Sequence, residues 1–512
     1  MKISNLFFSL ALVCATSIPT LAKDWPQWGG SAHKNLYTAA KGMPESFDPG
    51  KFKRRSEEID MATTKNVVRV LKLGSSAYGN TTVAGGKVYV GTNNDVPRDE
   101  RHQGDRSNLY CFDEKTGEFL WQFVSPKLAA GQVGDWEYIG LCSAAAVEGN
   151  RLYIVGNRCE IICLDTEGLK NGNQGFQDES KFMTPAGEEK VEVGPTDADI
   201  IWVYNMREEL GVFPHNATSS SVVVVGDAVF CSTSNGQDGE HESIPFPMAP
   251  CLIALDKNTG ELIGEEAEGI SKRMFHANWS SPSYAEVDGQ GMVLFGGGDG
   301  VLYAFDPKPK KDKDGIGVLQ KIWSVDCVPD KYKKDDKGNA IKYPAADGPS
   351  EIIATPVYHD GRIYVAIGQD PEHGEGVGNF VCIDAKTGKQ VWNFDEINRS
   401  LSSASVDPTT GLIFVCDHTG YVYCLDGKTG KKHWAYDSLA HLWGSTLVGD
   451  GKVYVGDEDG DVVILPAKAD WDPESDPLLE VNLQGPIYST PVYANGRLYV
   501  ATQSHLYVIG KE

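Results

Sequence analysis

Residues 382–392 read CIDAKTGKQVW, and this short stretch decides the fold. It combines a strand that ends in an aspartate, a Lys-Thr-Gly turn and a second strand that ends on tryptophan. The same frame recurs at residues 111–121 (CFDEKTGEFLW) and 424–434 (CLDGKTGKKHW), and residues 254–264 (ALDKNTGELIG) keep the turn but lose the tryptophan. Self-similarity of this kind indicates a repeat architecture rather than several unrelated domains.

Each copy lies inside a larger repeating unit. The unit is a short strand, a glycine-containing turn, a β-branched and aromatic strand, a loop, a strand that ends in aspartate, a turn and a last strand. Eight units follow one another from Tyr78 to Ile509, and the eighth shows only three strands. Residues 66–73 (NVVRVLKL) alternate like a lone strand, which we expect to complete the eighth unit and close the ring. The sequence therefore predicts an all-β fold over residues 65–512, an eight-bladed β-propeller of four-stranded antiparallel blades.

The N-terminus has the features of an export signal. Residues 1–22 contain Lys2, an apolar run over residues 6–15 and a small-residue cleavage site, Thr20-Leu21-Ala22. The apolar run is too short to span a bilayer, and no later stretch is long enough to predict a transmembrane segment. We therefore expect an exported protein, periplasmic or extracellular, with an N-terminal arm over residues 23–64 ahead of the propeller.

Charge and cysteine positions exclude some classes of function. The formal net charge is −24, and no basic stripe offsets it, so nucleic acid is not an expected partner. Four of the eleven cysteines stand two residues before the repeat aspartate, where other copies have alanine; they are Cys111, Cys163, Cys382 and Cys424. We expect small buried thiols at these positions. The sequence leaves the oligomeric state open, with a monomer as the expectation.

At this frame the chain resembles the propeller repeats of pyrroloquinoline quinone (PQQ) dehydrogenases and their cofactor-free relatives. The resemblance implies that the tryptophan packs blade against blade. For a working enzyme it also implies PQQ, a vicinal cysteine pair, a calcium ion held by Glu and Asn, and a catalytic Asp. No Cys-Cys dipeptide occurs, and neither the calcium ligands nor the aspartate can be placed by motif. PQQ and calcium stay candidate cofactors, and no catalytic residue is assigned.

Two long loops share a polar pattern. Because the strands of a blade are antiparallel, the loops between blades and those joining second to third strands lie on one face, and most of the long loops fall there. Residues 236–241 and 368–373 both read G-Q-D-x-E-H. Their carboxylates and imidazoles suit a divalent cation or an acid/base pair. The alternative is a turn sequence retained after duplication, with its charges in water. The candidate metal ligands are Asp238, Glu240, His241, Asp370, Glu372 and His373.

Residues ahead of the innermost strands should surround a central funnel on the same face. Mixed aromatic and polar walls suit a planar or sugar-like ligand, or a peptide. The alternative is that the aromatic residues only plug the channel. The candidate ligand-binding residues are His215, Asn216, His276, Asn278, Trp279, Glu351, His441, Trp443 and Tyr488, with Tyr78 and Asn80 beside them.

The preferred hypothesis is an exported propeller that acts as a ligand- or protein-binding scaffold in the cell envelope. Its partner, a protein or a small molecule, would bind the face that carries the loops between blades. The first alternative is an oxidoreductase that uses PQQ and calcium on alcohols or sugars. The second is a propeller that binds a metal ion through the paired G-Q-D-x-E-H loops.

Overall fold

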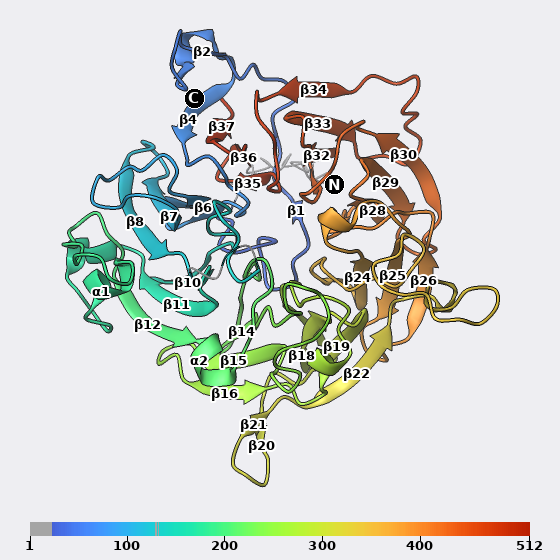
Figure 1. Ribbon diagram of the computed structural model, residues 1–512. Coiled ribbons are helices and arrows are strands. Elements are labelled where there is room, and N and C mark those ends of the chain that lie inside the picture. The colour runs from blue at the N-terminus through green and yellow to red at the C-terminus, as the bar shows by residue number, and fades with distance from the viewer. Residues whose placement is uncertain (1–22, 129–130, 132, 512) are drawn as a thin grey trace, which may run out of the picture.

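The computed structural model describes residues 23–128, 131 and 133–511, and most of its regular elements are β-strands. Eight sheets surround a central axis, and the chain passes once around the ring from blue to red (Figure 1). The predicted eight-bladed propeller is confirmed. The predicted signal peptide, residues 1–22, lies outside the described residues.

Each blade is an antiparallel sheet whose strands follow one another from the axis outward. In blades 1 to 4 the strands are β5 (Thr82–Ala84), β6 (Lys87–Asn93), β7 (Arg106–Asp113), β8 (Phe119–Pro126); β9 (Ala146–Glu148), β10 (Arg151–Gly156), β11 (Glu160–Asp165), β12 (Ile200–Asn205); β13 (Val223–Val225), β14 (Ala228–Ser232), β15 (Leu252–Asp256), β16 (Leu262–Glu265); and β17 (Ser283–Val287), β18 (Gln290–Gly296), β19 (Val301–Phe305), β22 (Lys321–Asp326). In blades 5 to 8 they are β23 (Val357–His359), β24 (Arg362–Ile367), β25 (Asn379–Asp384), β26 (Gln390–Phe394); β27 (Ser405–Val406), β28 (Leu412–Cys416), β29 (Tyr421–Asp426), β30 (Lys432–Asp437); β31 (Leu447–Gly449), β32 (Lys452–Gly456), β33 (Asp461–Pro466), β34 (Leu479–Asn482); and β35 (Val492–Ala494), β36 (Arg497–Ala501), β37 (His505–Ile509), β4 (Val67–Lys72).

The repeat motif forms both the outer turn of a blade and its contact with a neighbour. In blade 5, Asp384 Oδ1 accepts hydrogen bonds from the backbone N–H and the hydroxyl of Thr387, at 3.0 and 2.8 Å. Trp392 Nε1 then donates to the Gly427 carbonyl of blade 6 at 3.2 Å. Gly430 of blade 6 packs on that indole so closely that a Cβ there would lie 2.5 Å from the ring.

The tryptophan contact recurs around the ring, so the role implied by the resemblance is confirmed. Indole nitrogens donate to the next blade in the pairs Trp121 to Thr166, Trp202 to Lys257, Trp323 to Ala385 and Trp434 to Lys468.

The ring closes with a strand from the start of the chain. The strand β4, drawn blue, pairs antiparallel with the red strand β37, and Leu71 lies opposite Leu506 (Figure 1). The prediction that residues 66–73 complete the last blade is confirmed. Closure pairs the edge that the eighth blade would otherwise expose.

The N-terminal arm lies against the free edges of the innermost strands. Its Trp25 exchanges backbone hydrogen bonds with Val83 of blade 1, and its carbonyl groups accept further bonds from blades 2, 4, 5 and 7. The strand β1 (Tyr37–Thr38) runs parallel to β31. The other backbone contacts are Pro26 with Val147, Ala32 with Tyr284, His33 with Tyr358 and Leu36 with Val448. Trp28 Nε1 also donates to Thr355 Oγ1 at 2.9 Å. The arm therefore runs around the axis along the innermost strands.

Insertions decorate this framework. They form short hairpins, β2 (Lys51–Phe52) with β3 (Ile59–Asp60) and β20 (Lys310–Lys311) with β21 (Gly317–Val318), the latter added to blade 3. The α-helices are α1 (Glu179–Met183), α2 (Met206–Leu210) and α3 (Asp330–Lys333), and the 3-10 turns are η1 (Met61–Thr63), η2 (Gly168–Asn171), η3 (Ile270–Lys272) and η4 (Pro371–His373). None of the helices within the described ranges has the length and apolar character that crossing a membrane requires.

The described cysteines are unpaired. Cys111, Cys163, Cys382 and Cys424 are buried free thiols on the third strands, as predicted. Cys142 is the only one of the described cysteines that is not fully buried.

Candidate functional site

A cavity of about 730 Å³ occupies the centre of the propeller. It opens on the face that carries the loops between blades, and Trp28 of the arm contributes to its wall with Thr355. Its size is that of a typical small-molecule site. Nine residues predicted from the sequence line it: the funnel residues Tyr78, Asn80, Asn216, Trp279, His441, Trp443 and Tyr488, and Asp370 and Glu372 of the second G-Q-D-x-E-H loop.

One wall of the cavity is an aromatic cluster built around a carboxylate. Tyr78 stacks on Tyr488 with ring centroids 4.8 Å apart, and Trp443 lies 4.9 Å from Tyr488. Glu458 accepts hydrogen bonds from Trp443 Nε1 at 3.2 Å and from the Tyr488 hydroxyl at 3.1 Å. The Nδ1 atom of His441 is 3.3 Å from the same carboxylate. The sequence did not single out Glu458, because it follows the second strand of blade 7 without a motif.

A second group, which we call the histidine cluster, consists of His215, His241 and His276. The Nε2 atom of His241 lies 3.1 Å from Nε2 of His215 and 3.0 Å from Nε2 of His276. His215 and His276 are each 1% exposed, whereas His241 is exposed. Trp279 lies beside the cluster, with its ring 5.1 Å from His276, and also lines the cavity. The cluster therefore adjoins the cavity wall.

Three neighbouring loops bring these histidines together. His215 precedes blade 3, His241 lies between β14 and β15, and His276 precedes blade 4. Isolated β-bridges, Pro214 with Asn235 and Gly236 with Ala277, tie the three loops. A Cβ at Gly236 would lie 2.5 Å from the Cβ of His215, so the glycine of the first G-Q-D-x-E-H loop is needed for this close approach.

A chain of polar groups continues behind the histidine cluster. Nδ1 of His276 is 3.9 Å from Glu351 Oε1, and the Tyr343 hydroxyl lies 3.1 Å from Glu351 Oε1 and 3.0 Å from His373 Nδ1. Burial lowers the pKa of His276 to about 2 and raises that of Glu351 to about 8. Both shifts favour the neutral forms of the two groups.

The second G-Q-D-x-E-H loop reaches this chain through His373. Burial lowers the pKa of His373, and its ring lies 5.0 Å from that of His276 and 6.3 Å from that of His241. The two loops with the shared pattern therefore face one another, although their histidines make different contacts.

The remaining candidate residues bond within their own loop or to a neighbouring loop. Asp238 accepts hydrogen bonds from Glu242 N and Ser243 Oγ of its own loop. Asp370 accepts hydrogen bonds from Asn216 Nδ2 at 3.0 Å and from the backbone N–H of Glu372. Asp370 and Glu372 both line the cavity. Glu240 is exposed. Asn278 is buried and bonds to the Asn235 carbonyl and Gly298 N–H. The structure thus gathers histidines, not the carboxylates of the two loops.

Residues 320–505 match the family described as outer membrane protein assembly factor BamB. Three or more copies of the repeat and the eight-bladed ring agree with that match. The chain carries PQQ-like propeller repeats. A comparison with curated proteins finds no match.

Several solved structures share the fold. BamB from Moraxella catarrhalis is 15% identical with a TM-score of 0.54, covering 87% of this chain and 99% of its own. A europium-containing methanol dehydrogenase is 11% identical with a TM-score of 0.58, covering 96% and 99%. Quinohemoprotein alcohol dehydrogenase from Comamonas testosteroni is 13% identical with a TM-score of 0.61, covering 97% and 82%. At these identities the likeness shows the architecture alone.

The PQQ-like repeat raises the question whether the cavity fits the quinone itself. PQQ is a tricarboxylate, and an anion of that kind needs arginine, lysine or amide donors around it. Among the described lining residues there is no arginine or lysine, and four are acidic: Glu137, Asp370, Glu372 and Glu458. The charge of the cavity therefore does not fit PQQ. A neutral or cationic molecule fits it better.

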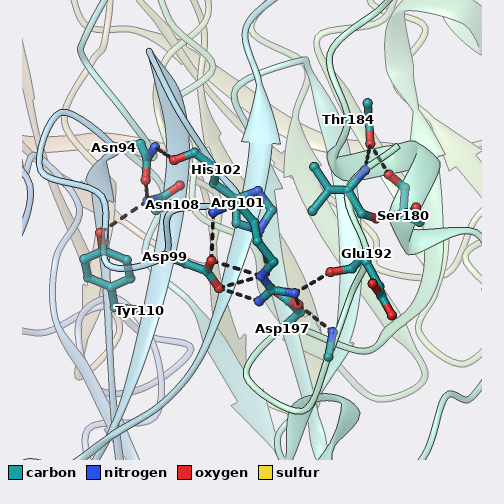
Figure 2. Close-up of polar contacts among 12 residues, drawn as sticks. Asn94, Asp99, Arg101, His102, Asn108, Tyr110, Ser180, Thr184, Glu192 and Asp197 are labelled. Carbon is teal, nitrogen blue, oxygen red and sulfur yellow. Dashed lines mark hydrogen bonds and ion pairs between the residues drawn. The ribbon is translucent and has the colours of Figure 1, made fainter. Parts of the chain in front are cut away.

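In a further group of side chains that could bind a metal, an arginine already neutralises the carboxylate charge. Asp99, His102 and Asp197 lie close together, but Figure 2 shows the Arg101 side chain between the two aspartates. Its guanidinium is 3.0 Å from Asp197 Oδ2 and 2.9 Å from both oxygens of Asp99. This group links the loop after β6 to the insertion after β11, and it holds a fixed cation of the protein's own. Neither it nor the histidine cluster is a set of oxygen ligands that would suit calcium.

Proposed function

We propose that this protein is an exported binding propeller of the cell envelope, whose central cavity takes a small neutral or positively charged organic molecule. The observation that carries the proposal is the lining, in which an aromatic wall stands beside carboxylates and no described residue is a lysine or arginine. Aromatic faces attract cations and stack on sugar rings, and carboxylates add charge or hydrogen-bond acceptors.

The location in the envelope is supported by two features of the sequence. Residues 1–22 have the pattern of an export signal. Residues 320–505 match the family described as outer membrane protein assembly factor BamB. Long loops around the cavity offer a surface for a protein partner as well, which is the property that the BamB description suggests.

Ligand binding can be tested on the purified mature chain with three probes. Glucose represents neutral sugars, choline represents organic cations, and PQQ with calcium represents the anionic quinone. We expect glucose or choline to bind saturably in calorimetry and to raise the melting temperature. We expect PQQ to leave the melting temperature unchanged, because the acidic cavity repels an anion.

A matched pair of variants locates the binding site. Glu458→Gln keeps the shape of the aromatic wall and removes one charge, so choline binding should weaken about tenfold. Glu474→Gln makes the same change at an exposed residue outside the cavity and should leave binding unchanged. Tight, stoichiometric PQQ binding with dye reduction by alcohols or sugars would contradict the proposal and favour the oxidoreductase.

A further inference from the structure

The Nε2 atoms of the histidine cluster cannot all be paired by hydrogen bonds among themselves. His215 Nδ1 lies 2.8 Å from the Gln237 carbonyl, so this nitrogen carries the proton and donates it. Burial lowers the pKa of His215, because it disfavours the charged ring. In the neutral ring, the Nε2 atom of His215 then carries a lone pair, which faces the Nε2 atom of His241 at 3.1 Å.

The two short contacts of His241 cannot both be hydrogen bonds. Its Nε2 atom has one in-plane position, which holds either a proton or a lone pair. If it holds the proton, only one of His215 and His276 can accept it. If it holds a lone pair, that lone pair faces the lone pair of His215. A single cation accepting all three lone pairs removes the conflict.

The wider surroundings of the cluster fit ligands of a metal ion. Metal-bound histidines donate their second ring N–H to a carbonyl or a carboxylate, which fixes the ring. His215 does this with Gln237, and Nδ1 of His276 faces Glu351 at 3.9 Å and has no hydrogen-bond partner among the described residues.

The backbone of His241 is held in an unfavourable conformation. Its φ is +56°, in the left-handed region that non-glycine residues adopt at a cost. The residue is exposed on a loop, so burial of its own side chain does not repay this cost. A bond from its ring to an ion would.

We propose that His215, His241 and His276 together bind one divalent first-row transition-metal ion, of the zinc or copper type, beside the central cavity. Four ligands at 2.0–2.1 Å in a tetrahedron are about 3.3 Å apart. The observed separations of 3.1 and 3.0 Å need to open only slightly. Three protein nitrogens leave a fourth position for water or a bound molecule.

Among metals, three neutral imidazoles select the transition series. Calcium and magnesium prefer oxygen ligands, which this cluster does not supply. The carboxylates predicted from the two G-Q-D-x-E-H loops are not among its members, so of those six residues only His241 is a ligand. Glu351 is a positioning residue, because it lies behind His276 rather than among the three Nε2 atoms.

The test uses Co²⁺ as a spectroscopic probe on the full mature chain, after removal of bound metal with a chelator. We expect one Co²⁺ per chain, the visible absorption bands of a four-coordinate cobalt ion, and displacement by Zn²⁺. His241→Ala should weaken Co²⁺ binding by at least about 100-fold, and Glu351→Gln by about 10-fold to 100-fold. His433→Ala, which removes an exposed histidine from blade 6, should bind as the wild type does.

His241 is the primary variant because it is exposed, so its loss should not prevent folding; circular dichroism of the metal-free proteins verifies this. The proposal is overturned if wild type binds no stoichiometric Co²⁺, or if folded His241→Ala binds it as tightly as wild type. No organic ligand takes part in the measurement, so its result is independent of the proposal for the cavity.

Discussion

At the scale of single residues, glycine and tryptophan of the repeat act as one contact. Gly430 has a φ of +72° and lies directly on the Trp392 ring of the preceding blade. The turn needs glycine for two separate reasons, its backbone conformation and the lack of space for a Cβ. Gly411 needs it for the first reason only, since its φ is +74° and nothing lies within 4 Å of the Cβ position.

This pair allows the two reasons to be measured separately. Gly411→Ala should lower the free energy of unfolding by about 1–2 kcal/mol, the cost of a left-handed backbone. Gly430→Ala should lower it by about 1–3 kcal/mol more, because the new methyl group displaces Trp392. Denaturant unfolding followed by tryptophan fluorescence measures both. If both variants lose the same free energy of unfolding, the Trp392 ring can move away from the new methyl group without loss of stability.

A buried lysine predicts how stability depends on pH. Lys34 is completely buried, and its amine contacts Gln27 Oε1 at 3.1 Å and the Val222 carbonyl at 3.4 Å. Burial lowers its pKa from 10.5 to about 7. Between about pH 7 and 10.5 the unfolded chain holds a proton that the folded chain has released, so this residue makes stability rise with pH across that window.

Lys34→Met removes this contribution. We expect the variant to match or exceed the wild type in stability at about pH 7, where folding of the wild type must still overcome burial of the amine. As the pH increases toward about 9.5, the stability of the wild type should rise relative to that of the variant. Guanidinium midpoints at the two pH values measure the difference. Parallel changes in both proteins would mean that Lys34 reaches solvent.

At the scale of elements, neighbouring loops are held together in two different ways. On the cavity face, isolated bridges join the backbones of adjacent loops, as at Glu351 with Gly368. At blade 1 the link is a charged side chain. Arg101 joins the loop after β6 to the insertion that precedes β12, and it also donates to the Glu192 carbonyl (Figure 2). Asp197 has 0% of its side chain exposed, whereas that of Arg101 is 34% exposed.

Arg101→Ala should loosen this insertion. Asp197 would keep its bond from Gly194 N–H but lose the guanidinium, which should cost about 1–2 kcal/mol after screening by solvent. Trypsin should then cut faster near Lys190, a residue of the insertion, as mass spectrometry of the fragments would reveal. Arg54→Ala, at an exposed residue of the arm, is the control. Unchanged cleavage in Arg101→Ala would contradict the tether.

At the scale of the whole molecule, the sequence predicts the ring much better than the site. Blade number, the closing strand and the blade contacts follow from the repeat frame, because each depends on residues close together in the chain. The cavity residues Trp443 and Tyr488 could be placed by their position before an innermost strand.

The histidine cluster could not be placed in this way. His215, His241 and His276 come from three loops, and which ring atoms meet depends on bridges and backbone angles that no motif shows. Tyr343 was missed for the same reason. It lies in an irregular loop, yet its hydroxyl joins Glu351 to His373. The shared G-Q-D-x-E-H pattern indicated the region and included His241, but the carboxylates that it also suggested are not part of the cluster.

The N-terminal arm has a consequence for how such a ring can change during evolution. Asp24 bonds to Asn495 of blade 8, Trp25 and Pro26 to blades 1 and 2, and the last backbone contact is with blade 7. A stretch of fixed length thus spans the whole inner circumference. Gain or loss of a blade would change that circumference and leave the arm too short or too long. The arm therefore acts as an internal measure of blade number, and duplication of a blade would have to be matched by a change in its length.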